Sequence, residues 1–291
     1  MIVGENLMDF TKKMFGFKNP FSGGPTLAAA CGSDQGKRRK NNEDNLYFKG
    51  FRMPEGTEGP EDYMPSDNHG SEVVVEKEYT LSQDSFFCVF DGMGGGDFGE
   101  VASYTAAKTA REYLAVEQHI NPCDITPSLT EMCNVINQAV YQAGMNLGSD
   151  QTGSTLVGLY FHAGQVWICN LGDSRGYLLR GGRLLQISQD HTDAAFMQEN
   201  GITGRKPYLT QYLGIDPDEM MIEPYIKSYY LQEGDTFLIC SDGVTDMVEE
   251  QEICRILAHN EDVGDCVDLL IQAALDGGGK DNITAIVVRM E

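Results

Sequence analysis

The sequence predicts an α+β fold built on antiparallel strands. Strand patterns come in runs, most densely between residues 154 and 187. Helical patterns come in two pairs, at 99–118 with 125–147 and at 249–258 with 263–275. Strands and helices do not alternate regularly, which disfavours a doubly wound parallel sheet and favours an antiparallel layered arrangement. No internal repeat is apparent.

The first part of the chain combines a tail, short strands and an insertion. Residues 1–25 hold a short amphipathic piece, and we interpret them as an N-terminal tail and linker, with a docking peptide as the alternative. Residues 51–71 are rich in Pro, Gly, Glu and Asp, which indicates a surface insertion. Strands are expected at four places in this part: 26–31, 45–49, 73–79 and 86–90.

The remaining elements follow from the same patterns. Two helices at 99–118 and 125–147 show apolar residues at helical spacing. We then expect a short helix at 190–200 and a mixed loop at 201–214, before the second helix pair. Strands are predicted at 154–162, 165–171, 175–180, 183–187, 223–231, 236–240 and 283–289, with Gly181-Gly182 as a hairpin turn.

Composition narrows the class of protein. The 291 residues include 41% hydrophobic and 22% charged residues, as in an ordinary globular protein. The net charge of −23 argues against binding to nucleic acid or to anionic membranes. None of the eight cysteines forms a Cys-x-x-Cys pair, and several lie in apolar runs. We therefore expect reduced thiols in a cytoplasmic protein.

Acidic residues recur where predicted strands begin or end. Asp91 follows an apolar strand and precedes glycines, and Asp242 does the same later in the chain. Asp281 opens the last strand after a glycine loop, while Glu43 and Asp44 open the second strand. Each of them alone is more often structural or solvated. Together they suggest carboxylates that converge on one end of a sheet.

A cluster of carboxylates in a cleft needs cations, because like charges raise each other's pKa. Ligation by oxygen without His or Cys points to Mg²⁺ or Mn²⁺ rather than to zinc. Two such ions bridged by one Asp activate a water and clamp a phosphoryl oxygen. A nearby arginine would hold the phosphate through paired hydrogen bonds. The chemistry implied is hydrolysis of a phosphate ester.

Six short motifs in order resemble those of a known family. They are Arg39-Lys-Asn-Asn-Glu-Asp44, Asp91-Gly-Met-Gly-Gly95, Gly153-Ser-Thr155, Gly172-Asp-Ser-Arg175, Ser241-Asp-Gly243 and Asp281-Asn282. The chain resembles the metal-dependent protein serine/threonine phosphatases of the type 2C class, in their bacterial form, over roughly residues 27–290. The resemblance implies a four-layer α-β-β-α sandwich, with two central antiparallel sheets flanked by helix pairs. It also implies a single phosphatase domain over residues 26–291.

The resemblance assigns metal ligands to five matching positions. Asp91 would bridge two tightly bound ions with help from the carbonyl of Gly92. Asp242 and Asp281 would complete the binuclear site. Asp150 matches the acid that helps to hold a third, weaker ion, although an exposed loop aspartate is the alternative.

The same resemblance assigns roles around the ions. Glu43 and Asp44 would bind metal or hold its waters. Arg39 matches the arginine that binds the substrate phosphate, with Arg38 as its competitor one residue away. Two further family features are interpreted as structural: an Arg–Asp brace in the motif ending at Arg175, and a packing or capping role for His191.

The sequence departs from the family pattern at three places. Met93 stands where some relatives carry a histidine that is a candidate general acid. The flap, defined here as residues 194–214, is shorter than in bacterial relatives, and its Arg205 and Lys206 could contact substrate. The insertion at 51–71 is unusual and could shape partner choice.

The leading hypothesis is a Mg²⁺- or Mn²⁺-dependent hydrolase of phosphoserine and phosphothreonine in proteins. It would oppose a Ser/Thr kinase in signalling and act as a monomer on phosphorylated protein substrates. One alternative is a catalytically silent module that binds phosphoproteins, and loss of a metal-binding aspartate would mark it. A phosphatase that releases an anti-sigma-type partner and an acidic metal-binding protein without chemistry are further alternatives.

Overall fold

The computed structural model describes residues 26–48, 77–80, 85–93, 98–116 and 119–291. Three features expected from the sequence lie outside these residues: the tail at 1–25, the insertion at 51–71 and the glycines that follow Met93. No helix in the described ranges has the length and apolar character needed to span a bilayer.

Two antiparallel sheets form the centre of the fold. The first sheet has the order β3-β1-β12-β11-β8-β9, with bounds Lys77–Thr80, Thr26–Asp34, Ile283–Met290, Thr236–Cys240, Arg175–Arg180 and Arg183–Gln186. The second sheet has the order β10-β7-β6-β4-β2, with bounds Tyr225–Tyr230, Gln165–Leu171, Leu156–His162, Ser85–Met93 and Asp44–Phe48. A short strand, β5 (Gly153–Ser154), pairs with β4.

The sheets pack face to face because alternate residues of the central strands are apolar. In β1, Leu27, Ala29 and Cys31 belong to the core between the sheets, whereas Ala28 and Ala30 face the helices of the first sheet. The rings of Phe161 (β6) and Phe237 (β11) meet edge to face, with centroids 5.5 Å apart, and join the two sheets.

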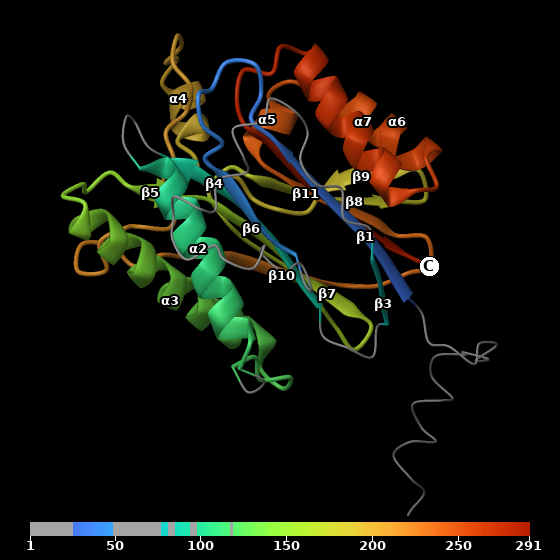
Figure 1. Ribbon diagram of the computed structural model, residues 1–291, viewed down its shortest axis with the longest axis horizontal. Helices are drawn as coiled ribbons and strands as arrows, with labels where there is room; N and C mark the ends of the chain where they lie inside the picture. Colours follow the sequence, from blue (N-terminus) through green and yellow to red (C-terminus); the bar gives the residue numbers. More distant parts are fainter. Residues whose placement is uncertain (1–25, 49–76, 81–84, 94–97, 117–118) are drawn as a thin grey trace, which may run out of the picture.

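Two helix pairs cover the outer faces. Helices α2 (Gly99–Leu114) and α3 (Ile125–Asn146) pack on the second sheet, and α6 (Glu250–His259) and α7 (Val263–Asp276) pack on the first. Figure 1 shows the pairs on opposite sides of the strands. The predicted four-layer α-β-β-α arrangement is therefore confirmed.

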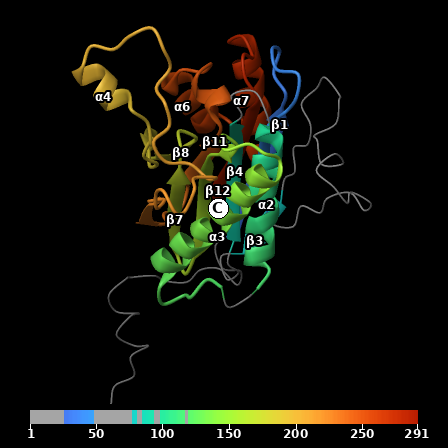
Figure 2. The ribbon, with the colours of Figure 1, turned by 90° about the vertical axis from the view of Figure 1, so that its left-hand side faces the viewer.

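Several expected boundaries were wrong. The helix predicted to reach residue 118 ends at Leu114, and the strand predicted from residue 154 is interrupted at Thr155. A short helix that the sequence did not predict, α5 (Asp242–Thr245), begins at the acid expected only to end a strand. The helix expected at 190–200 is shorter, α4 (Ala194–Glu199), and Figure 2 shows it standing away from the body of the molecule.

Candidate active site

Asp44 and Asp91 lie directly opposite each other on neighbouring strands. The register of β2 and β4 pairs their Cα atoms, so both side chains emerge on the same face. Asp44 is only 2% exposed, and the hydroxyl of Ser241 donates to its Oδ2 at 2.7 Å. Like charges placed directly opposite in a sheet repel each other. This pair therefore needs a compensating cation or a proton.

The main chain of Asp91 is fixed by Thr155, in one of the six motifs. The Asp91 amide donates to the Thr155 hydroxyl at 3.0 Å, and the Thr155 amide donates to the Asp91 carbonyl at 2.8 Å. The hydroxyl of Ser154 also donates to that carbonyl, at 3.1 Å. These bonds explain why Thr155 interrupts the predicted strand, because its amide and hydroxyl bond to the main chain of β4.

Asp242 and Asp281 come to the same edge from the first sheet. Asp242 begins α5, with only Ser241 between it and β11, and Asp281 lies two residues before β12. The two strands are neighbours, and the Ser241 amide donates to the Thr284 carbonyl at 3.0 Å. Ser241, next to Asp242, also bonds to Asp44 of the second sheet, so both sheets contribute to one cluster.

Burial and mutual repulsion raise the pKa values of Asp44, Asp91 and Asp242. The pKa of Asp91 lies well above its ordinary value because of burial first, and then because of the charges of Asp44 and Asp242. Burial raises the pKa of Asp44 to about 7, although the hydrogen bond from Ser241 opposes the shift. The pKa of Asp242 is also raised by burial, against the opposing charge of Lys206.

Glycines allow the close approach of the backbones around these acids. A Cβ atom on Gly92 would stand 2.1 Å from the Gly99 carbonyl oxygen and 2.5 Å from that of Glu43. A Cβ atom on Gly243 would stand 1.8 Å from the Asn282 carbonyl oxygen. Both positions therefore exclude any larger residue, which explains why an Asp-Gly pair recurs at the two strand ends.

Arg39 faces the cluster. Its guanidinium donates to Asp281 at 2.7 Å and lies 3.7 Å from a carboxylate oxygen of Glu43. Its pKa is raised by the hydrogen bond to Asp281 and by nearby negative charges that include Asp91, although burial opposes the shift. Burial also raises the pKa of Glu43. Arg38, the alternative phosphate ligand, is exposed.

The flap supplies a second cation. The ammonium of Lys206 binds a carboxylate oxygen of Asp242 and, at 3.1 Å, one of Asp246. Arg205 instead pairs with Asp193 at 2.5 Å, and its guanidinium lies 4.0 Å from the centre of the Tyr208 ring. Of the two residues expected to contact substrate, only Lys206 bonds to the cluster.

One acid expected at the site lies away from the carboxylate cluster, and another acid lies close to it. Asp150 is exposed in the loop before β5, and no described contact joins it to the cluster. Asp173, which we had placed in a structural motif, has its pKa raised to about 6 by burial and by the charge of Asp242. Its charge in turn raises the pKa of Asp91. The motif that contains Asp173 was the available signal, but the sequence alone does not show which way the Asp173 side chain points.

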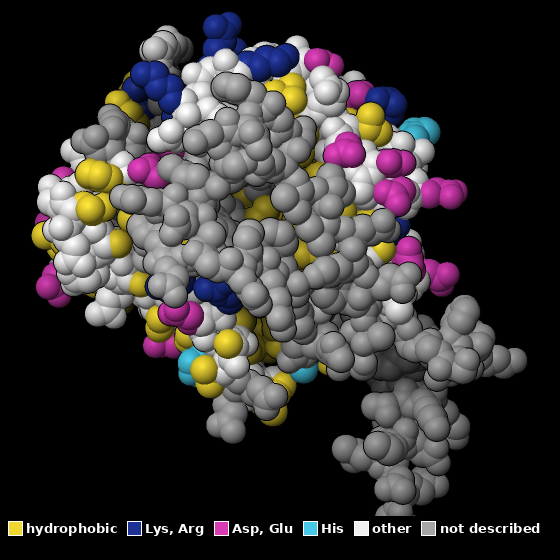
Figure 3. All heavy atoms as spheres, viewed as in Figure 1, with side chains coloured by type: hydrophobic (Ala, Val, Ile, Leu, Met, Phe, Trp, Pro, Cys, Tyr) yellow, Lys and Arg dark blue, Asp and Glu magenta, His cyan; other side chains and the backbone are white. Residues whose placement is uncertain are grey.

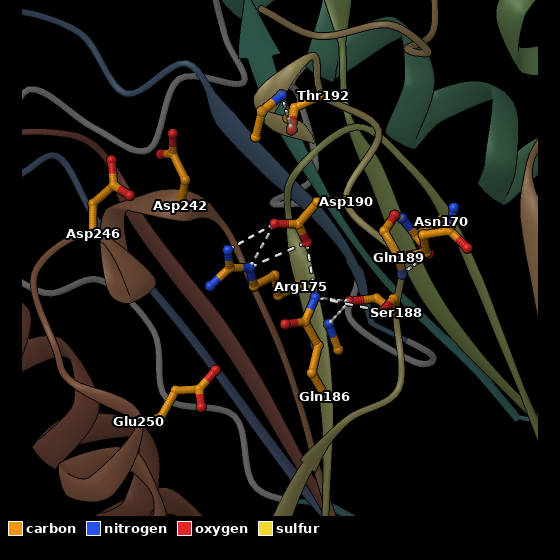
Figure 4. Close-up of polar contacts among 12 residues, drawn as sticks. Asn170, Arg175, Gln186, Ser188, Gln189, Asp190, Thr192, Asp242, Asp246 and Glu250 are labelled. Carbon is orange, nitrogen blue, oxygen red and sulfur yellow. Dashed lines mark hydrogen bonds and ion pairs between the residues drawn. The ribbon is translucent and has the colours of Figure 1, made fainter. Parts of the chain in front are cut away.

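The expected Arg–Asp brace exists with a different partner. Arg175 forms its ion pair with Asp190, 15 residues away, at 2.7 Å. Figure 4 shows the guanidinium turned toward Asp190, which also accepts from Gln186 at 2.8 Å. The Gly172 amide donates to the His191 ring at 3.3 Å, which gives that histidine a structural contact.

Asn282 is a positioning residue that the sequence analysis missed. Its side-chain amide donates to the carbonyls of Gln35 and Asn41, both at 2.8 Å. Its side-chain oxygen accepts from the Glu43 amide at 2.8 Å. One side chain thus fixes the loop that carries Arg39. Its place in the motif Asp281-Asn282 was the available signal.

The cluster fits a hard divalent cation by its chemistry. Its side chains offer carboxylate oxygens, which suit Mg²⁺ or Mn²⁺. In the described residues no three His, Cys, Asp or Glu side chains are drawn together around one point. Arg39 and Lys206 instead neutralise two of the carboxylates. Acids that meet from both sheets and already attract two cationic side chains are suited to bind metal.

Comparisons with known proteins agree with this geometry. The protein phosphatase 2C family matches residues 77–275. The serine/threonine phosphatase stp of Listeria welshimeri is 32% identical over 210 residues, covering 69% of this chain and 82% of that protein. The serine/threonine protein phosphatase PstP of Mycobacterium tuberculosis is 29% identical over 270 residues, covering 90% of this chain and 44% of that protein.

Solved structures give the same relationship. The catalytic domain of PstP in complex with two manganese ions is 28% identical, with a TM-score of 0.68 over 91% of this chain and 99% of that one. PppA, a regulatory component of the type VI secretion system in Pseudomonas aeruginosa, is 28% identical, with a TM-score of 0.69 over 91% and 98%. With this match and these relatives, the chain belongs to the protein phosphatase 2C family, in its bacterial serine/threonine phosphatase form.

Proposed function

We propose that this enzyme removes phosphate from phosphoserine and phosphothreonine in proteins, using Mg²⁺ or Mn²⁺ held at the edge of the sandwich. The observation that carries the proposal is the convergence of Asp44, Asp91 and Asp242 from both sheets, beside the guanidinium of Arg39. The relatives' names and the manganese-bound structure of PstP support it.

The residues that would hold two tight ions are those at the strand ends. Asp91 would bridge them with the carbonyl of Gly92, and Asp242 and Asp281 would complete the site. When bound, a divalent cation supplies Lewis-acid polarisation of the phosphoryl group and makes water a nucleophile near neutral pH. The chain itself contributes the negative charge and the oxygen ligands of these residues.

The surrounding residues would orient water and substrate. Glu43 and Asp44 would bind metal or hold its waters, and Asp150 would help to hold a third, weaker ion. Arg39 would bind the phosphate through its guanidinium, which lies at the carboxylates in the structure. Met93 offers no proton for the leaving group, so that proton would come from water or from another residue.

The flap and the chain's context complete the proposal. Lys206, which pairs with Asp242, would contact the substrate and adjust specificity for it. Arg205, which pairs with Asp193, would do the same. Residues 26–291 would act as one phosphatase domain, as a monomer, on phosphorylated proteins and against a Ser/Thr kinase. The eight cysteines are free thiols, which supports a reducing, cytoplasmic setting.

The test is hydrolysis of an aryl phosphate and of a phosphothreonine peptide with Mn²⁺, with Mg²⁺ and with chelator. We expect turnover only with metal. The Asp242→Ala variant should lose more than about a hundredfold in rate, because even residues behind a metal ligand cost up to that much. Asp268→Ala, an exposed aspartate on α7, is the matched control. Metal binding without turnover in the wild type would instead indicate a silent phosphoprotein-binding module.

The same assay tests whether Arg39 binds the substrate phosphate. Arg39→Ala should mainly raise KM for the phosphopeptide, since a charged hydrogen bond is worth about 1.5–3 kcal/mol, or roughly ten- to hundredfold. A larger effect of Arg38→Ala on the aryl phosphate would transfer the role to that residue.

A further inference from the structure

An unusual concentration of cations lies beside the carboxylate cluster. The chain has 21 Lys and Arg against 44 Asp and Glu, yet four consecutive cations occupy positions 37–40. They lie in the loop between β1 and β2. The contacts of Arg39 with Asp281 and Glu43 place this loop at the edge of the site.

The loop is held in one conformation. The Lys37 amide donates to the Gly279 carbonyl at 2.7 Å, and its ammonium donates to the Leu275 carbonyl at 2.7 Å. The side chain of Gln35 donates to the Arg39 carbonyl at 2.9 Å. Together with the bonds from Asn282, these contacts fix the backbone that carries the cations. Charges on a fixed backbone are preorganised for a partner.

Three of the nearby cations form no ion pair among the described residues. Arg38, Lys40 and Lys280 are exposed, and among the described residues none has an ion pair to an acid. Lys280 belongs to the loop before β12, which touches the first loop where Gly279 meets Lys37. We call these three residues the cationic rim. Figure 3 shows dark blue side chains gathered along the upper edge of the molecule, where the β1–β2 loop lies in Figure 1.

The rim changes the local electrostatics of an otherwise repulsive molecule. A net charge of −23 opposes the approach of phosphorylated, acidic proteins. Salt screens that general repulsion beyond about 8–10 Å, whereas charges in contact act at shorter range. Cations at the edge of the site would therefore select which phosphorylated segment is held there.

We propose that the cationic rim binds acidic residues that flank the phosphorylated serine or threonine of a protein substrate. This inference rests on the proposed function and specifies its substrate class. Another part of the surface would suit flanking residues of the opposite charge. Asp246, Glu249 and Glu250 line a cavity of about 220 Å³ there, and they would suit basic flanking residues. The experiment distinguishes the two.

The first measurement is binding, so that it does not depend on turnover. Three peptides carry a non-hydrolysable phosphonate analogue of phosphothreonine between acidic, neutral or basic flanks, and bind the full chain with Mn²⁺. We expect a Kd about three- to tenfold lower for the acidic than for the neutral peptide, as two exposed ion pairs would give. The difference should shrink in high salt.

The variant Lys40→Glu/Lys280→Glu should bind the acidic peptide no more tightly than the neutral one. The ratio of the acidic-peptide Kd to the neutral-peptide Kd should therefore rise to one or above. Arg183→Glu/Lys108→Glu is the control, because it also reverses the charge of two exposed cations, at the start of β9 and on α2, outside the cationic rim. It should leave the ratio unchanged. Equal binding of all three peptides, or a preference for the basic one, overturns the inference.

A parallel assay with hydrolysable phosphopeptides separates this inference from the proposed function. An acidic preference in binding without any turnover keeps the inference and removes the proposed activity. Turnover with no preference between the peptides does the reverse.

Discussion

Asp44 is a buried carboxyl group in a β-strand, and its surroundings explain why this edge of the sandwich attracts cations. It faces Asp91 across β2 and β4 and accepts one hydrogen bond from Ser241. The hydroxyls of Ser241 and Thr284 do not offset burial and the charges of Asp242 and Asp281, so the pKa of Asp44 rises to about 7. The protein must protonate such a group or bind a cation beside it.

This shift predicts how the metal-free protein responds to pH. Asp44 titrates near its ordinary value of 3.8 when unfolded and at about 7 when folded, so the folded state binds more protons between these values. The free energy of unfolding therefore falls as pH rises from about 4 to 7. We expect the Tm in chelator to decrease over this window, in thermal melts at several pH values.

Asp44→Asn isolates the contribution of this side chain, because other groups also titrate in the window. His191 acts in the opposite sense, since burial lowers its pKa. The wild type should lose stability with rising pH more steeply than Asp44→Asn. Equal slopes in the two proteins would contradict a raised pKa at Asp44.

The charged side chain of Lys206 joins the flap to the site. Lys206 comes from the loop after α4 and binds Asp242 and Asp246, at the start and just beyond the end of α5. Asp242 is also a proposed metal ligand, so the ammonium and a divalent cation would compete for one carboxylate. Binding of Lys206 to Asp242 would then disfavour a fully metal-bound site.

Replacing Lys206 by methionine tests this competition. Lys206→Met should raise the affinity for Mn²⁺ several-fold and lower the Tm in chelator, because Asp242 loses its cation. Calorimetric titration with Mn²⁺ and thermal melts measure the two effects. Arg205→Met is the matched control, since Arg205 pairs with Asp193 inside the flap region. An unchanged Mn²⁺ affinity in Lys206→Met would show that the contact does not compete.

The whole sandwich brings the site together from its two sheets. The first sheet carries Asp242 and Asp281, and the second carries Asp44 and Asp91. Their positions depend on the apolar core between the sheets, where Phe161 meets Phe237. A cation bound between the sheets would therefore stabilise the packing of the entire domain.

Metal binding should accordingly raise the stability of the full chain. At a Mn²⁺ concentration a hundred times Kd, linkage gives about 2.7 kcal/mol, which corresponds to roughly 5 °C in Tm for a domain of this size. Thermal melts over a Mn²⁺ series, with chelator as reference, measure the shift. Asp91→Ala should lose most of it, and an equal rise in that variant would place the metal elsewhere.

Local patterns in the sequence were sufficient for the architecture and for the principal acids. Alternation of apolar residues over strands and their spacing in helices are short-range signals, so the antiparallel α+β class followed from them, and the four layers followed from the resemblance of the motifs to a known family. The Asp-Gly pairs at 91 and 242 are local too, because the glycine next to each acid reflects a close backbone approach that the structure contains.

Other features required the folded chain, because they join residues that are remote in sequence. Asn282 bonds to Gln35 across 247 positions, and Lys206 meets Asp242 across 36. Whether Asp173 joins the acids or braces a turn depends on the direction of one side chain, which packing decides. Sequence patterns report which face of an element is apolar, whereas hydrogen bonds between distant loops depend on how the sheets and loops come together in three dimensions.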